Sequence, residues 1–283
     1  ASAERVIEFM EQKPQVVSEN GEEIDNDEGS ISFRDVSFAY PGKKHHVLSD
    51  LSFNVNPGET VALVGASGVG KSTIVKMLMR FYEPSEGEVY LNGHALKNVD
   101  LQSLRNQIAV VFQESLIFDG TVRENIAYGK PDATDEEITD AAKKADAHGF
   151  ISELSDGYDT NVGQKGRNLS GGQQQRVAIA RAMIRKASVV ILDEPAEGLD
   201  GATEKRVMEP MQRLMENTAT LMITHNLRSA SIADKIVYLD KENITEIGTH
   251  DELISQNGNY KKLYTAQQGE EKEEKVLEAG AAR

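Results

Sequence analysis

The chain has 283 residues, 39% of them hydrophobic, and is long enough for one large or two small domains with a buried core. Its formal net charge of -15 disfavours nucleic-acid binding, because a polyanion is repelled on average. The absence of cysteine excludes disulfides, thiolate metal sites and cysteine nucleophiles. The sequence has no membrane-spanning apolar run and no signal-peptide pattern, so we expect no direct membrane insertion of this fragment.

The predicted elements begin with a short helical pattern over residues 4–10, followed by a polar, acid-rich segment typical of a linker. This helix looks cut from something longer, so we expect residues 1–29 to be a linker and the end of a connecting helix. From Ile31, the alternation ISFRDVSFAY predicts a half-buried strand. VLSDLSFNVNPGE predicts a second strand that ends in a turn. Together they indicate an antiparallel unit.

The rest of the pattern is typical of an α/β fold. TVALVG is an apolar strand, followed by a glycine loop and the predicted helix KSTIVKMLMRFY. SVVILDE, ATLMITH and KIVYLD are later apolar runs that follow helical segments, as a buried parallel sheet requires. Helix signals dominate residues 114–185, which we expect to form an inserted helical subdomain. Residues 269–283 are charged, with almost no apolar face, and predict a disordered tail.

GASGVGKS, residues 65–72, matches the phosphate-loop pattern G-x-x-x-x-G-K-[ST] and lies between a strand and a helix. Small residues let successive backbone N–H groups face phosphate oxygens at the positive end of the following helix. Lys71 is expected to reach the β- and γ-phosphates, and Ser72 to ligate Mg²⁺. An acidic chain can bind a nucleotide through so concentrated a site. The expected contacts are Gly65, Ser67, Gly68, Gly70, Lys71, Ser72 and Thr73.

VVILDE brings Asp193 and Glu194 to the carboxyl end of a buried strand, where open α/β sheets place ligands. Asp193 is predicted to be the carboxylate on the Mg²⁺ side. Glu194 is placed to orient or deprotonate an attacking water. Two acids alone would more often simply end a strand, but the phosphate loop upstream favours the catalytic interpretation.

LSGGQQQR, residues 169–176, opens a helix with a second anion-binding nest that has no obvious phosphate to serve in the same chain. At this point the sequence resembles the ATP-binding cassette (ABC) ATPases, whose signature is LSGGQ. The resemblance implies that two subunits sandwich two ATP molecules, each signature helix facing the partner's phosphate loop. The residues expected to contact the partner's nucleotide are Ser170, Gly171, Gly172 and Gln173.

The resemblance covers about residues 30–268. It implies an α/β fold: a P-loop NTPase (RecA-like) core with an antiparallel β subdomain and an inserted α-helical subdomain. Tyr40 matches the aromatic residue that stacks on adenine, although a core or edge tyrosine is nearly as common. Gln113, in VVFQE, matches the glutamine that contacts the metal and the attacking water. His225, in MITHN, matches the histidine that contacts the γ-phosphate, and Asp200 matches the acid of the loop after Glu194, with a helix N-cap as its alternative role.

Two longer stretches, SLRNQIAVVFQESLIFDGTVRENIAYG and GYDTNVGQKGRNLSGGQ, resemble ABC exporters, in which the ATPase domain follows a membrane domain in one polypeptide. This implies a place at the cytoplasmic face of a membrane, with a transmembrane domain and a second nucleotide-binding domain as partners. The sequence departs from the exporter pattern twice. Gln164 and Lys165 replace a Glu-Arg pair, and residues 196–198, Ala-Glu-Gly, replace Thr-Ser-Ala or similar.

The leading hypothesis is an Mg²⁺-dependent ATPase that dimerises head to tail around two ATP molecules and drives export. Its catalytic residues are predicted to be Lys71, Gln113, Glu194 and His225. The alternative is a module that closes on ATP but hydrolyses it weakly, which the altered segment 196–198 favours. A soluble ABC ATPase of DNA repair or translation is disfavoured, because no long coiled coil lies between the phosphate loop and the signature.

Overall fold

The computed structural model describes residues 5, 7, 10, 16–18, 21–25, 29–195, 198 and 201–269. Its first sheet is antiparallel, in the strand order β2-β1-β4-β5. Ile31 pairs with Val55, which confirms the antiparallel unit predicted from the sequence. The strands alternate buried and exposed positions because one face packs on the core. Their bounds are β1 (Ile31–Phe38), β2 (Leu48–Val55), β4 (Glu86–Leu91) and β5 (His94–Ala95).

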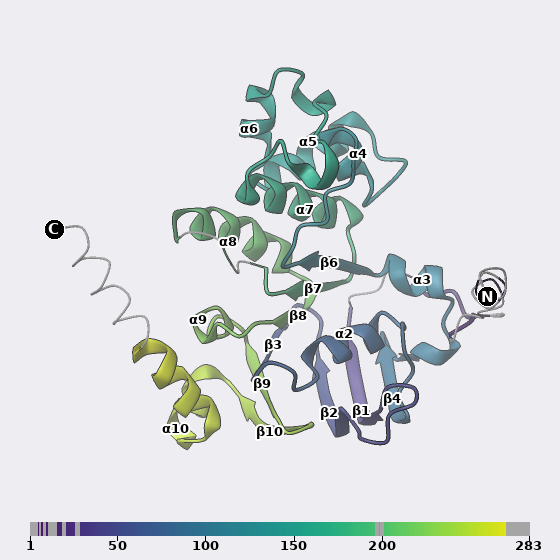
Figure 1. The fold of residues 1–283 in the computed structure, drawn as a ribbon, viewed down its shortest axis with the longest axis vertical. Coiled ribbons are helices and arrows are strands. Elements are labelled where there is room, and N and C mark those ends of the chain that lie inside the picture. Colours follow the sequence, from purple (N-terminus) through teal and green to yellow (C-terminus); the bar gives the residue numbers. More distant parts are fainter. Residues whose placement is uncertain are drawn as a thin grey trace.

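The second sheet has the order β10-β9-β3-β8-β7-β6 and runs through the middle of the molecule (Figure 1). All its neighbours pair in parallel except β10, which pairs antiparallel with β9. Every residue of β3 and β8 is buried, which explains their continuous apolar sequences. The bounds are β3 (Thr60–Gly65), β6 (Ile108–Phe112), β7 (Val189–Asp193), β8 (Ala219–Ile223), β9 (Lys235–Asp240) and β10 (Asn243–Gly248).

The helix after β3 is shorter than predicted. α2 (Lys71–Leu78) ends at Leu78 rather than at Tyr82. Arg80 has a φ of 52°, outside the helical region, and its guanidinium donates a 2.7 Å hydrogen bond to the Val99 carbonyl. The other helices outside the segment between β6 and β7 are η1 (Leu96–Asn98), α3 (Leu101–Asn106), α8 (Gly201–Met215), α9 (Leu227–Ala230), α10 (His250–Gln256) and a helix over residues 259–269.

A group of helices is inserted between β6 and β7, which are neighbours in the sheet. Figure 1 shows this group as a separate lobe, away from the β1–β4 sheet. Capping boxes begin α4, α5 and α7, so the sequence itself defines where these helices start. Their bounds are α4 (Val122–Ala127), α5 (Asp135–Lys144), α6 (His148–Glu153), η2 (Gly157–Asp159), η3 (Gln164–Gly166) and α7 (Gly171–Arg185).

The observed architecture confirms the predicted α/β class, with a parallel core, an antiparallel β unit and an inserted helical group. The residue limits assigned to each subdomain, and the tail assigned to residues 269–283, stay predictions. Among the helices that the structure describes, none combines the length and the apolar character needed to cross a bilayer.

Candidate functional site

Four parallel strands bring the predicted site residues to one edge of the main sheet. β3 ends at Gly65 and leads into the phosphate loop, while β7 ends at Asp193. β8 lies between them and is followed by Thr224 and His225. β6 lies on the other side of β7 and leads to Gln113. Because the strands are parallel, their carboxyl ends share an edge, which is the usual position of a ligand site in such sheets.

The phosphate loop needs glycine for two different reasons. Gly65 has a φ of 145°, and a Cβ there would lie 2.3 Å from the Leu239 carbonyl oxygen. Gly68 has a φ of 84°, a conformation that favours glycine, and no atom of the described residues lies within 4 Å of where a Cβ would be. In the described part of the chain, the backbone N–H groups of residues 68–72 donate no hydrogen bond to another protein group. Such a row of backbone N–H groups is suited to donate hydrogen bonds to the oxygens of a bound anion.

Lys71 lies folded against the phosphate loop. Its Nζ donates hydrogen bonds to the carbonyl oxygens of Gly65, at 2.8 Å, and Ala66, at 3.1 Å. Burial lowers the pKa of Lys71, and the carboxylates of Glu194 and Asp193 act in the opposite direction. Burial and the neighbouring Glu194 raise the pKa of Asp193, which Lys71 partly offsets. Such a group of perturbed charges at a sheet edge is typical of a functional site.

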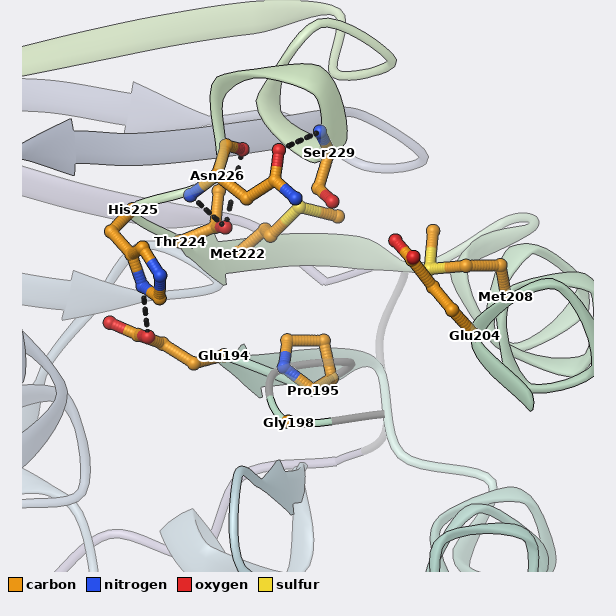
Figure 2. A pocket seen from close by; sticks show the side chains of 10 residues that line it. All are labelled: Glu194, Pro195, Gly198, Glu204, Met208, Met222, Thr224, His225, Asn226 and Ser229. Carbon is orange, nitrogen blue, oxygen red and sulfur yellow. Dashed lines mark hydrogen bonds and ion pairs between the residues drawn. The ribbon is translucent and has the colours of Figure 1, made fainter. Parts of the chain in front are cut away.

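Glu194 and His225 form a pair that sequence reasoning missed. Glu194 has a φ of 50°, and its N–H donates a 2.9 Å hydrogen bond to the Ile223 carbonyl on β8. Its carboxylate shares a hydrogen bond with His225 Nδ1. Figure 2 shows the pair beside a cavity of about 240 Å³, with Pro195 and Thr224 in its lining. Adjacency of β7 and β8 is the signal that could have predicted this contact.

Tyr40 belongs to an aromatic cluster next to the phosphate loop. Its hydroxyl is 3.0 Å from Thr73 Oγ1, so it contacts the first turn of α2. Its ring meets Phe38 edge to face at 4.9 Å and Tyr82 at 5.2 Å. The structure therefore places Tyr40 beside the phosphate loop in a packed aromatic cluster, while its stacking on adenine stays a prediction.

Gln113 directly follows the end of β6, the strand next to β7. It is exposed and lines a second cavity, of about 460 Å³, rather than the cavity beside Glu194. Its neighbours around this second cavity include Lys165, Gly171 and Pro195. Gln113 is therefore close to the first residue of α7 and to the residue that follows Glu194.

Gln175 was not predicted from the sequence, yet it joins three parts of the site. It lies on α7, is only 3% exposed and accepts a hydrogen bond from the Ser115 hydroxyl after β6. Its Nε2 donates a 2.8 Å hydrogen bond to the carbonyl oxygen of Pro195, directly after Glu194. Residues 173–175 are all glutamine, so the sequence does not indicate which of the three is buried.

The signature segment forms the start of α7. Ser170 and Gln173 form a capping box, in which Gln173 Oε1 accepts a 2.8 Å hydrogen bond from the Ser170 N–H. Ser170 and Gly171 are exposed, whereas Gly172 is buried. α7 and α2 lie well apart in Figure 1, so the signature does not sit over its own phosphate loop helix. Ala196, Glu197 and Asp200, all named in the sequence analysis, lie outside the described residues.

Comparison with known proteins gives the family. The model of the family described as ABC transporter matches residues 48–197. YgaD of Bacillus subtilis, described as a proposed multidrug export ATP-binding/permease protein, is 44% identical over 94% of this chain and 46% of its own length. An ATP-dependent lipid A-core flippase of Alkalilimnicola ehrlichii is 43% identical over 94% of this chain and 45% of its own.

A solved structure is also similar. The structure of a bacterial Atm1-family ABC exporter with ATP bound superposes with a TM-score of 0.87 at 36% identity, over 94% of this chain and 46% of that one. The chain thus spans about half the length of the relatives it matches. By its sequence and its fold, the chain belongs to the ABC transporter family, as an ATP-binding domain of the exporter type.

Proposed function

We propose that this domain binds ATP with Mg²⁺, pairs head to tail with a second nucleotide-binding domain and hydrolyses ATP to power export through a membrane domain. The domain would work at the cytoplasmic face of that membrane. The observation that carries the proposal is the meeting of Lys71, Asp193 and the Glu194–His225 pair at one sheet edge. Titratable groups gathered at the carboxyl edge of a parallel sheet, with the pKa values of Lys71 and Asp193 shifted by burial, are typical of a functional site.

The phosphate loop supplies the ATP site. The backbone N–H groups of residues 68–72 face no protein acceptor in the described chain and suit phosphate oxygens. Lys71 is already held at the loop and would exchange its bonds to Gly65 and Ala66 for phosphate oxygens. We assign the adenine contact to Tyr40, because its hydroxyl bonds to Thr73 at the start of α2.

We assign the Mg²⁺ site to Ser72, Asp193 and Gln113. In the part of the chain that is described, no group of three or more His, Asp or Glu side chains could hold a metal by itself. A hydroxyl, one carboxylate and one amide suit Mg²⁺, which keeps several waters and shares the oxygens of a bound phosphate. When bound, Mg²⁺ would neutralise charge that develops on the phosphate oxygens.

Glu194 is assigned as the general base. In hydrolysis, a water oxygen bonds to the γ-phosphorus, the bond from this phosphorus to the bridging oxygen breaks, and the water proton passes to Glu194. The Glu194 backbone is fixed by its bond to Ile223, and its carboxylate is held by His225 Nδ1. These two contacts keep the base at the sheet edge, beside the loop that holds the nucleotide.

A membrane-domain segment is the partner that we assign to the exposed apolar surface between β6 and α7. Leu116 is 55% exposed, Phe118 43% and Tyr128 63%. They line a cavity of about 240 Å³ together with Arg181. Contiguous exposed apolar side chains favour a protein contact. The similar exporter proteins are more than twice as long as this chain, which supports a segment of the same polypeptide as the occupant.

Phosphate release by the purified chain with ATP and Mg²⁺ tests the proposal. Lys71→Ala should abolish turnover through loss of phosphate binding, and Glu194→Gln should lower it by about 10²- to 10⁴-fold through loss of the base. Glu204→Gln is the matched control, because Glu204 lines the same cavity as Glu194. Full activity of Glu194→Gln would overturn the assignment. ATP binding without measurable turnover in the wild-type chain would instead favour the module that hydrolyses weakly.

A further inference from the structure

The helix over residues 259–269 reaches across to the loop that carries His225. Gln267 Nε2 donates a 2.7 Å hydrogen bond to the His225 carbonyl oxygen. Gln267 Oε1 accepts a 3.0 Å hydrogen bond from the Leu227 N–H. One amide side chain thus holds the backbone on both sides of Asn226. The contact spans 42 positions in the sequence between Gln267 and His225.

These two bonds complete the support of a short loop. Leu227 begins α9, and the first N–H groups of a helix have no partner within the helix. The Asn226 side chain accepts from Arg228 N at 2.9 Å and from Ser229 N at 3.4 Å. The Leu227 N–H is served by Gln267 instead. Two of the hydrogen bonds to the backbone of this loop therefore come from a residue of a distant helix.

The other end of this helix is firmly held. Tyr260 is fully buried, and its hydroxyl is 2.8 Å from His250 Nδ1. The Asn259 N–H donates a 2.5 Å hydrogen bond to the Glu246 carboxylate on β10. The helix also packs on the core through Leu263 and Tyr264, so Gln267 projects from a supported element one turn further on.

We propose that Gln267 is a positioning residue for His225, and that the helix over residues 259–269 sets the pairing of His225 with Glu194. The carbonyl that Gln267 holds belongs to the same residue whose Nδ1 bonds the Glu194 carboxylate. A shift of the His225 backbone would move the imidazole away from Glu194, and the Glu194 carboxylate would lose its hydrogen bond to His225 Nδ1. The inference rests on the proposed hydrolysis for its effect on rate, but its structural part can be tested without turnover.

The first test measures steady-state ATP hydrolysis. Gln267→Leu removes both hydrogen bonds and should lower kcat by about tenfold, with KM for ATP changed less than about twofold. Gln267→Glu keeps an acceptor for the Leu227 N–H and should retain more activity. Gln268→Leu is the control, since Gln268 is on the same helix and its Nε2 donates a 3.3 Å hydrogen bond to the Tyr264 hydroxyl rather than to the loop of His225. Wild-type kcat in Gln267→Leu, or a KM effect alone, would overturn the proposal.

The second test measures the NMR chemical shifts of the His225 imidazole in the absence of nucleotide. Its signals, assigned by their loss in His225→Ala, should shift in Gln267→Leu and stay in place in Gln268→Leu. Thermal unfolding of each variant would show that the fold is kept. Unmoved imidazole signals in a folded Gln267→Leu variant would refute the positioning role. If the wild-type chain does not hydrolyse ATP while these signals shift, the proposed function fails and the positioning role stands.

Discussion

At the scale of single residues, Gly172 shows that one position can serve two purposes. The signature pattern assigns it to an anion-binding nest on the basis of its small size. The structure adds that Gly172 is buried on α7, where a Cβ would lie 2.4 Å from Thr203 Cγ2 on α8. A glycine inside a helix normally costs stability relative to alanine, but here it permits close helix packing.

Gly172→Ala should therefore lower the free energy of unfolding by about 1 to 3 kcal/mol, because the added methyl group overpacks the α7–α8 contact. Thr203→Ser removes Cγ2 and should restore most of this loss in the double variant. Urea unfolding of the chain without nucleotide provides the measurement. Gly149→Ala serves as the control, since no atom of the described residues outside its own helix backbone lies within 4 Å of a Cβ there. Equal unfolding free energies of Gly172→Ala and the wild-type chain would contradict the packing argument.

At the scale of elements, sequence patterns predicted part of the fold. The largely apolar strands β3, β7, β8 and β9 were each predicted, whereas β4 and the equally apolar β6 were not. β10 was missed because it is an edge strand without a buried residue. The predicted end of α2 was wrong: the chain leaves the helical conformation at Arg80, whose φ is 52° and whose side chain donates a hydrogen bond to the distant Val99 carbonyl. Local sequence carries no information about such a partner.

The site divides in the same way. Lys71 could be predicted from the spacing of the phosphate-loop pattern, and Asp193 from its place at the end of an apolar strand. The Glu194–His225 pair, the buried Gln175 and the support from Gln267 depend on contacts between segments that are distant in sequence. Their residue types are common on protein surfaces, so only the packed fold distinguishes them from solvated side chains.

The helix over residues 259–269 allows a prediction on pH. Burial raises the pKa of Tyr260 to about 12, so the folded state holds the phenol proton more tightly than the unfolded state does. The raised pKa therefore adds to the free energy of unfolding in full below about pH 10. This added stability, about 2 to 3 kcal/mol, is lost as the pH rises towards 12. The Tyr260→Phe variant has no phenol and so no such dependence on pH. It also lacks the hydrogen bond to His250, which should lower its free energy of unfolding by about 1 kcal/mol.

Tyr260→Phe should thus be less stable than the wild-type chain at pH 8 and more stable near pH 12, so the two curves cross. Urea unfolding across this range gives the measurement. Tyr128→Phe provides the control, because it removes an exposed phenol and leaves Tyr260 in place, so the loss of stability above pH 10 should remain. Parallel curves for Tyr260→Phe and the wild-type chain would show that the buried phenol does not couple folding to pH.

At the scale of the whole molecule, the two halves of the proposed ATP site lie on separate parts of the surface of the domain. Lys71 and the phosphate loop adjoin the β1–β4 sheet, whereas Ser170 and Gly171 begin α7 in the helical lobe (Figure 1). Exposed N–H groups at a helix start attract anions, yet α7 lies apart from α2 of the same chain. A second domain, turned head to tail, would bring each half to its complement.

Mixing two defective chains tests this arrangement. Lys71→Ala removes phosphate binding, and Gly171→Asp puts a negative charge where the partner's phosphates would lie. The Gly171→Asp chain should still fold, since an acid at a helix start is favourable. Either variant alone should fail to dimerise with ATP. A mixture should form a heterodimer with one intact site, made from the Gly171→Asp phosphate loop and the Lys71→Ala signature. Sedimentation of the mixture with ATP measures this, and a mixture that stays monomeric while the wild-type chain dimerises would exclude the head-to-tail site.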